Sequence, residues 1–265
     1  FNALRGSTDI EDIGEAEPGH ASTHSLLMEY YAGVAQEYLD KYGASPADFA
    51  RVAVKNRNKA ALNPLPLLRK PQTLEEVLNG RMIVPPLTLA MCSPTTDGAA
   101  AILVCSERVA ASLDRAGVVV RASCMASGAA GRPVGDAAAK AYAVAGVGPQ
   151  DFDLIELHDA AAPAELMQYD EIGLCPEGEG FRLIRDGVTD LRGPMPVNCS
   201  GGLLSRGHPL GATGCAQLVE LVTQLRGEAG ARQIEDARIA MSVNGGGWLD
   251  GAYALSIATI LERGK

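Results

Sequence analysis

Apolar residues recur every three or four positions in the first part of the chain, which is the spacing of one face of an α-helix. This periodicity predicts a helix over residues 24–42, and capping residues predict two further helices over 45–61 and 74–78. Gly43 is a typical stop for the first helix. Ser45 and Pro46 form a cap and first turn for the second helix, and Thr73 is a cap candidate for the third. Residues 1–20 lack this periodicity and predict a loop.

Shorter apolar runs follow further along the chain. The compact run Ala99–Cys105 predicts a buried strand, and a polar helix is expected near residues 107–116. Strands and helices then alternate. Strands are expected over 118–127, 152–157, 238–243 and 252–261, and helices over 137–145, 162–172 and 213–226. This order predicts a layered α/β domain from about residue 117 to the end.

Composition narrows the class of protein. The 265 residues are 47% hydrophobic and carry a formal net charge of −9, which argues against nucleic acid as the main partner. No apolar run approaches the roughly 18 residues that span a bilayer, and no secretory signal opens the chain. The six cysteines are scattered without metal-ligand or disulfide-dense spacing, so reduced thiols, a cytoplasmic location and no metal site are expected.

One histidine, His208, lies between two glycine-rich turns in the run 198–214. Glycine lets a backbone approach a ligand closely, and the helix expected from Thr213 directs free amides toward the same place. An imidazole and amides together can bind a developing oxyanion. The alternative is a hydrogen-bonded structural histidine in an ordinary strand-to-helix turn.

Two further segments follow expected strands. His158 and Asp159 come after the strand 152–157, where side chains in α/β folds commonly do chemistry. A histidine that only caps the next helix is the alternative, and Asp159 is expected to orient its neighbours. The glycines of 244–247 follow the strand 238–243 and suit an oxyanion-binding turn around Gly245, or a plain hairpin.

Two segments have weaker signals. The segment 93–98 carries short hydroxyl side chains that could contact an extended ligand, although an ordinary loop is the default interpretation. A cationic group on the second helix could attract a phosphate, but its spacing favours a solvated helix surface. The group consists of Arg51, Lys55, Arg57 and Lys59.

The motifs His158-Asp159-Ala160-Ala161, 207–214 (GHPLGATG) and 244–247 (NGGG), in this order and at these intervals, resemble the thiolase superfamily. The branch they resemble most is the sterol carrier protein type, whose HDxF motif replaces the NEAF motif of other thiolases. The resemblance implies a layered αβαβα fold. Residues 1–90 resemble its helical loop domain, 91–116 the end of its N-terminal half, and 117–265 its complete C-terminal half.

The resemblance implies an acyl-CoA C-acyltransferase that condenses acyl-CoA units or cleaves a 3-ketoacyl-CoA with CoA. Its substrates would be CoA and acyl-CoA, with no permanently bound cofactor, and it would be a homodimer or a higher oligomer. His208 would activate a cysteine and bind the thioester oxygen, which His158 and the Gly245 amide would also stabilise. The residues implied in substrate binding are Ser93, Ser200 and Gly201.

The chain also departs from the family pattern. The segment that carries the family's nucleophilic cysteine has no counterpart in residues 1–265, so this fragment alone is expected to be inactive. The acid/base cysteines would fall at Ala160 and Val243, and Cys199 is a weak candidate for the nucleophile. Two alternatives follow. One is a thiolase-like aldolase that acts on steroid or acyl-CoA side chains with a small partner protein, and the other is a non-catalytic acyl-CoA or lipid-binding protein.

Overall fold

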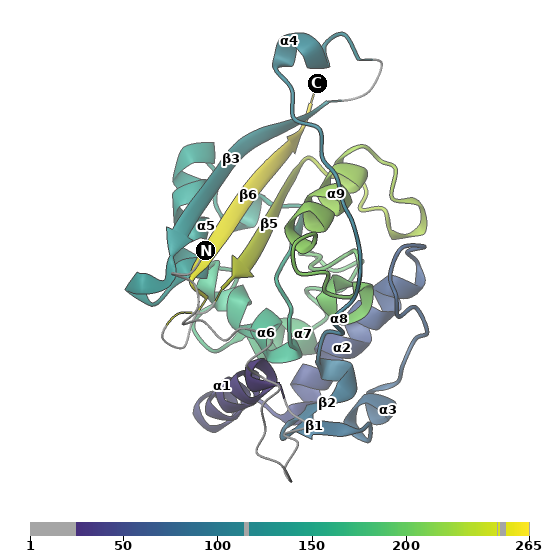
Figure 1. Ribbon diagram of the computed structural model, residues 1–265, viewed down its shortest axis with the longest axis vertical. Coiled ribbons are helices and arrows are strands. Elements are labelled where there is room, and N and C mark those ends of the chain that lie inside the picture. The colour runs from purple at the N-terminus through teal and green to yellow at the C-terminus, as the bar shows by residue number, and fades with distance from the viewer. Residues whose placement is uncertain (1–24, 114–116, 248, 250–252, 265) are drawn as a thin grey trace, which may run out of the picture.

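The computed structural model contains a four-stranded sheet with the order β3-β6-β5-β4 (Figure 1). The structure describes residues 25–113, 117–247, 249 and 253–264, so the loop expected over 1–20 lies outside the described residues. The strands are β3 (Val118–Ser127), β4 (Leu154–Glu156), β5 (Ile239–Gly246) and β6 (Leu255–Arg263).

The directions of the strands determine which strand ends lie at the same edge of the sheet. β4 runs parallel to β5, with Glu156 opposite Ser242, whereas β6 is antiparallel to both β5 and β3. The carboxyl ends of β4 and β5 therefore lie at one edge of the sheet. His158, just after β4, and Gly245, near the end of β5, are brought together there.

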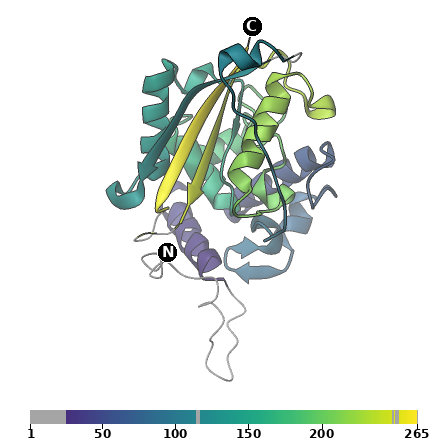
Figure 2. The ribbon, with the colours of Figure 1, turned by 45° about the horizontal axis from the view of Figure 1, so that its top comes forward.

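Two long helices flank the sheet, as Figure 2 shows. α5 (Pro133–Ala145) packs on β3 and β6, and its buried face consists mostly of alanines, which let a helix approach a sheet closely. α9 (Thr213–Leu225) packs mainly on β5 and buries Leu221 and Leu225. Both agree with the helices expected from the sequence, except that α5 begins four positions earlier.

The N-terminal helices begin and end at the residues that local capping chemistry predicts. α1 (Leu26–Tyr42) ends at Gly43, which adopts a left-handed φ of 69°. α2 (Pro46–Ala61) begins with a reciprocal cap between Ser45 and Asp48. α3 (Leu74–Leu78) begins in the same way at Thr73.

The strand expected over Ala99–Cys105 is wrong, because this segment has no regular structure. Leu103 and Val104 are 86% and 74% exposed. An apolar run becomes a strand only beside another strand, and none of the described strands pairs with this segment. The helix expected over 107–116 is shortened to α4 (Glu107–Ala110), and 114–116 lie outside the described residues.

Several short elements complete the fold. β1 (Met82–Val84) and β2 (Leu87–Thr88) pair as a small hairpin. α6 (Ala162–Glu171), α7 (Gly180–Arg185) and α8 (Gly202–Arg206) follow β4, and only α6 is expected from the sequence. Within the described part of the chain, no helix has the length and apolar character needed to cross a membrane.

Candidate active site

The fold brings His158 and His208 together. The first follows β4 and the second precedes α9, yet their ring centroids are 5.0 Å apart and their planes meet at 76°. His158 is buried, whereas His208 is partly exposed. The structure therefore joins the two histidines that sequence motifs single out separately.

The hydrogen bonds of His158 leave one ring nitrogen as a donor. Gly245 donates its backbone N–H to His158 Nδ1 over 2.9 Å, so Nδ1 carries no proton. Burial lowers the pKa of His158 to about 3, with His208 and Arg206 acting in the same direction. A neutral imidazole with an unprotonated Nδ1 holds its proton on Nε2. The Tyr253 ring stacks on this imidazole at 5.4 Å.

His208 has the opposite arrangement. Its Nδ1 lies 2.8 Å from Thr213 Oγ1, and that hydroxyl donates its proton to the Pro209 carbonyl. Thr213 Oγ1 therefore accepts from Nδ1–H, and Nε2 of His208 keeps a free lone pair. Burial, followed by the charge of Arg206, lowers the pKa of His208 to about 4. The pair thus offers one N–H donor and one proton acceptor side by side.

The segment 93–98 packs directly against the His208 loop. His208 donates its backbone N–H to the Pro94 carbonyl over 2.9 Å, and Thr95 forms a parallel bridge with His208. A Cβ on Gly207 would lie 2.6 Å from Thr96 Oγ1, so only glycine allows this approach. Ser93, which is partly exposed, lies at the start of this contact.

Three predicted site residues are held by contacts within the fold. The amide of Gly245, expected as an oxyanion donor, is used by His158. Ser200 is buried, and its hydroxyl donates to Glu156 over 2.6 Å. Gly201 has a φ of 103°, and a Cβ there would lie 2.7 Å from the Cβ of Ala60 in α2. The roles of these residues as direct ligands stay predictions.

Cys199 does not suit the role of nucleophile. Its side chain is fully buried, and burial raises the pKa of its thiol to about 12. A protonated, enclosed thiol neither attacks a thioester nor reaches the solvent. Burial also raises the pKa of Cys92 to about 12.

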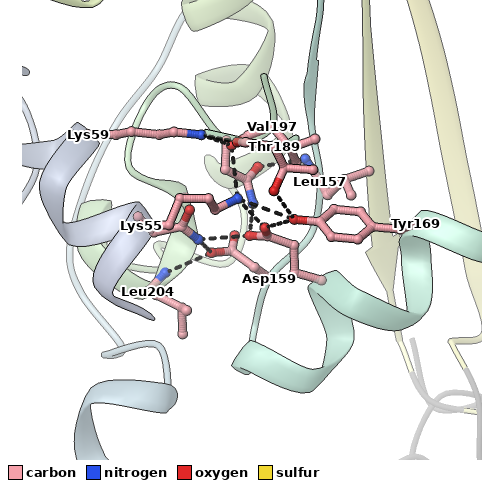
Figure 3. A network of polar contacts seen from close by, with 12 residues as sticks. Lys55, Lys59, Leu157, Asp159, Tyr169, Thr189, Val197 and Leu204 are labelled. Carbon is pink, nitrogen blue, oxygen red and sulfur yellow. Dashed lines mark hydrogen bonds and ion pairs between the residues drawn. The ribbon is translucent and has the colours of Figure 1, made fainter. Parts of the chain in front are cut away.

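The cationic side chains of α2 are less exposed to solvent than the sequence predicts. Arg51 is exposed, but Lys55, Arg57 and Lys59 are buried. Figure 3 shows Lys55 and Lys59 reaching into a network of polar contacts. The solvated helix surface predicted from spacing is therefore wrong for three of the four side chains.

The network pairs α2 with segments far along the chain. Lys55 forms a buried ion pair with Glu165 of α6 and also donates to the Val197 carbonyl. Lys59 donates to the carbonyls of Val197 and Thr189, the latter over 2.7 Å. Burial alone would raise the pKa of Glu165, but Lys55 reverses the effect and the net pKa is lowered.

Asp159 connects this network to the histidines. Its carboxylate accepts the backbone N–H of Leu203 over 2.7 Å and that of Leu204 over 3.4 Å, in the first turn of α8. It also accepts from Asn56 of α2 over 2.8 Å. Because Asp159 adjoins His158 and α8 leads to His208, this carboxylate fixes both loops, as the sequence predicts.

Arg206, the last residue of α8, carries a buried guanidinium group. Its three guanidinium nitrogens are buried, and none has a hydrogen-bond partner in the part of the chain that the structure describes. Its charge lowers the pKa values of both histidines. Among these described residues, no group of three or more His, Cys, Asp or Glu is placed to hold a metal ion.

Residues 119–262 match the family model described as "Thiolase C-terminal domain-like". The chain is 41% identical over 227 residues to an acetyl-CoA acetyltransferase of Methanothermobacter thermautotrophicus, covering 82% of this chain and 59% of that protein. It is 41% identical over 259 residues to the benzoylsuccinyl-CoA thiolase subunit BbsB of Thauera aromatica, covering 93% and 66%. Sterol carrier protein 2 of Oryctolagus cuniculus is 38% identical over 251 residues, covering 89% and 46%.

A solved structure described as "Ltp2-ChsH2(DUF35) aldolase" matches with a TM-score of 0.78 and 28% identity, over 89% of this chain and 63% of that one. The chain therefore spans between about half and two thirds of the proteins that it resembles. The family model covers more than half of the chain, and the relatives agree with it. This chain belongs to the thiolase family.

Proposed function

We propose that this chain carries the histidine half of a thiolase-type active site, which transfers an acyl group between CoA thioesters. The pairing of His158 and His208 carries the proposal, because their hydrogen bonds leave one Nε2–H donor and one free Nε2 lone pair. Acyl transfer needs both functions. One group polarises the carbonyl oxygen and the other takes a proton from the nucleophile.

The proposed thiolytic cleavage uses these groups in two stages. His208 Nε2 takes the proton of a cysteine thiol located outside residues 1–265, and the thiolate attacks the ketone carbon of a 3-ketoacyl-CoA. The bond between C2 and C3 breaks, and the departing enolate of acetyl-CoA takes the proton that His208 Nε2 holds. CoA thiol then attacks the acyl-cysteine thioester, which releases acyl-CoA and returns the proton to the cysteine.

His158 would stabilise the negative charge in this reaction. Its Nε2–H can donate to a thioester or ketone oxygen, and its pKa of about 3 keeps the ring neutral at physiological pH. The Gly245 amide would act through His158 by holding Nδ1 as an acceptor. Ser93 and the segment that follows it, which pack on the His208 loop, are proposed to contact the pantetheine arm of CoA.

We also propose a cytoplasmic homo-oligomer with CoA and acyl-CoA as substrates and no permanently bound cofactor. The location rests on the six free cysteines, and the oligomer rests on the family resemblance. These parts of the proposal are independent of the chemistry of the two histidines.

The test is to join the chain to an N-terminal thiolase segment that carries the nucleophilic cysteine and to measure CoA-dependent cleavage of acetoacetyl-CoA. We expect cleavage in the joined protein and a loss of at least about a hundredfold in His208→Asn, because that variant removes the proton acceptor. Lack of cleavage in a folded protein with its cysteine intact would overturn the proposal.

One observation favours a second candidate, a thiolase-like aldolase. The structural match is to an aldolase assembled from two named components, and the positions of the acid/base cysteines hold Ala160 and Val243 here. Retro-aldol cleavage needs a general base but no acyl-enzyme. Mass spectrometry separates the two candidates, since an aldehyde or ketone product indicates the aldolase and a new acyl-CoA indicates the acyltransferase.

A further inference from the structure

A pocket of about 210 Å³ lies between α1, α6 and the start of α5. Its apolar wall includes Val34 of α1, Val134 of α5 and Met167 of α6. Tyr253 also lines the pocket. No residue of this wall takes part in the chemistry proposed above.

Two of the residues that line the pocket also contact His158. Tyr253 lines the pocket and stacks on the His158 ring. Gln168 also lines it, donating from Nε2 to the His158 carbonyl over 2.8 Å and accepting the His158 N–H over 3.3 Å. A group in the pocket would therefore lie one aromatic ring away from the His158 imidazole.

The polar part of the lining suits a neutral ligand group that forms hydrogen bonds. The Tyr31 and Tyr253 hydroxyls bond to each other over 2.9 Å and form part of the wall. Burial, followed by the charge of Asp170, raises the pKa of Glu171 to about 7. In the described part of the chain no hydrogen bond engages the Glu171 carboxyl, which borders the pocket. This carboxyl can bind a hydroxyl group, and when it is ionised it repels an anion.

The volume limits the size of the occupant. An apolar cavity of about 150 Å³ is enough for a benzene ring. A pocket of about 210 Å³ therefore has room for one six-membered ring with a small substituent.

We propose that this pocket binds the distal end of the acyl group of a CoA thioester, as a single ring, or a branched group of the same size, that carries a hydroxyl. The proposal rests on the function proposed above, because it assigns the pocket to the thioester on which the two histidines would act. It adds a substrate class, namely ring-ended acyl-CoA.

The test measures binding by titration calorimetry with unreactive thioether analogues, so that the nucleophilic cysteine is not needed. S-(3-phenylpropyl)-CoA is compared with S-propyl-CoA on the unaltered chain. We expect the phenyl analogue to bind about tenfold more tightly, because the ring is removed from water. Equal affinities of the two analogues would overturn the pocket assignment and leave the proposed function intact.

Two valine variants test whether the tighter binding of the phenyl analogue depends on this pocket. Val34→Phe fills the pocket from the partly exposed face of α1 and should abolish the phenyl preference, while S-propyl-CoA binds as before. Val144→Phe is the matched control, since Val144 is 66% exposed on α5 and does not line the pocket. A phenyl preference that survives in Val34→Phe contradicts the proposal.

A third analogue tests whether the pocket prefers a ring that carries a hydroxyl. We expect S-[3-(4-hydroxyphenyl)propyl]-CoA to bind about fivefold more tightly than the phenyl analogue, which is the usual effect of one neutral hydrogen bond. Glu171→Gln keeps an oxygen acceptor and should keep this gain, whereas Glu171→Leu should lose it. The same gain in Glu171→Leu would overturn the role of Glu171.

Failure of the proposed function has a different signature. If neither S-propyl-CoA nor S-(3-phenylpropyl)-CoA binds to the folded chain, CoA thioester recognition fails and the pocket assignment fails with it. If S-propyl-CoA binds and only the ring preference is absent, the pocket assignment alone is overturned.

Discussion

Single hydrogen bonds decide what each of the two histidines can do. His158 accepts from the amide of Gly245, and His208 donates to the hydroxyl of Thr213. The motifs in the sequence predict both histidines as site residues. They do not predict the direction of these bonds, because Gly245 lies 87 positions from His158 and its role depends on how β4 and β5 pair.

Replacing Thr213 should change the tautomer of His208. Thr213→Val keeps the shape of the side chain but removes the acceptor for Nδ1–H, so we expect a mixture of both neutral tautomers. Nitrogen chemical shifts of the imidazole measure this directly. Thr223→Val on the same helix is the control, because that hydroxyl donates to the carbonyl of Val219. An unchanged, single Nδ1–H tautomer in Thr213→Val would contradict the assigned bond.

Replacing Arg206 should raise the pKa values of both histidines. A nearby positive charge disfavours protonation, so Arg206→Met removes one cause of the low values of about 4 for His208 and about 3 for His158. Burial is the larger cause, and both values should therefore stay below 6.5. The measurement is an NMR titration of the ring protons between pH 3 and 7.

Arg182→Met provides the control for this titration, since Arg182 lies on α7 with 63% of its side chain exposed. Histidine pKa values that fall or stay constant in Arg206→Met would show that the guanidinium does not act on the imidazoles.

Among the elements, α2 shows both what the sequence can predict and what it cannot. Its start follows from local capping at Ser45, and its position in the sequence is predicted closely. Its buried cations are not, because their acceptors Glu165, Thr189 and Val197 lie more than 100 positions away. The strand wrongly expected over 99–105 has the same origin, since a strand depends on a neighbour that its own residues do not specify.

Lys59 should make the stability of the protein depend on pH. Burial, followed by the charge of Lys55, lowers the pKa of Lys59 from 10.5 to about 7. Between these values the unfolded chain holds the proton and the folded chain does not, so the free energy of unfolding rises with pH. The neutral amine still has two N–H groups for its two carbonyl acceptors.

Urea unfolding of the unaltered chain and of Lys59→Met between pH 7 and 9.5 tests this effect. We expect the unaltered chain to gain stability over the variant by up to about 1.4 kcal/mol per pH unit. A difference between the two proteins that stays constant or shrinks with pH would contradict the lowered pKa.

At the scale of the whole molecule, the N-terminal helices and the sheet share one hydrophobic core. A single cluster of buried side chains runs from Tyr31 of α1 and Phe49 of α2 to Ile155 of β4 and Ile260 of β6. The Tyr31 hydroxyl also bonds to Tyr253 over 2.9 Å, just before β6. Segments 200 residues apart are therefore expected to unfold together.

Phe49→Ala should destabilise the helices and the sheet alike. Phe49 is fully buried, and removal of such a ring costs about 3–5 kcal/mol. Hydrogen exchange measured by mass spectrometry should show an equal loss of protection in peptides from α2 and from β5. Leu65→Ala is the control, since Leu65 is 71% exposed. Loss of protection confined to α2 would show that the helices unfold separately.

The two bonds of Lys59 also have a consequence for comparisons among related sequences. Both acceptors are main-chain oxygens, at Thr189 and Val197, and every amino acid supplies such an oxygen. A substitution at either position leaves the acceptor in place and requires no compensating change at Lys59. Methods that infer contacts from correlated substitutions should therefore miss this contact, although it joins α2 to the segment 189–197.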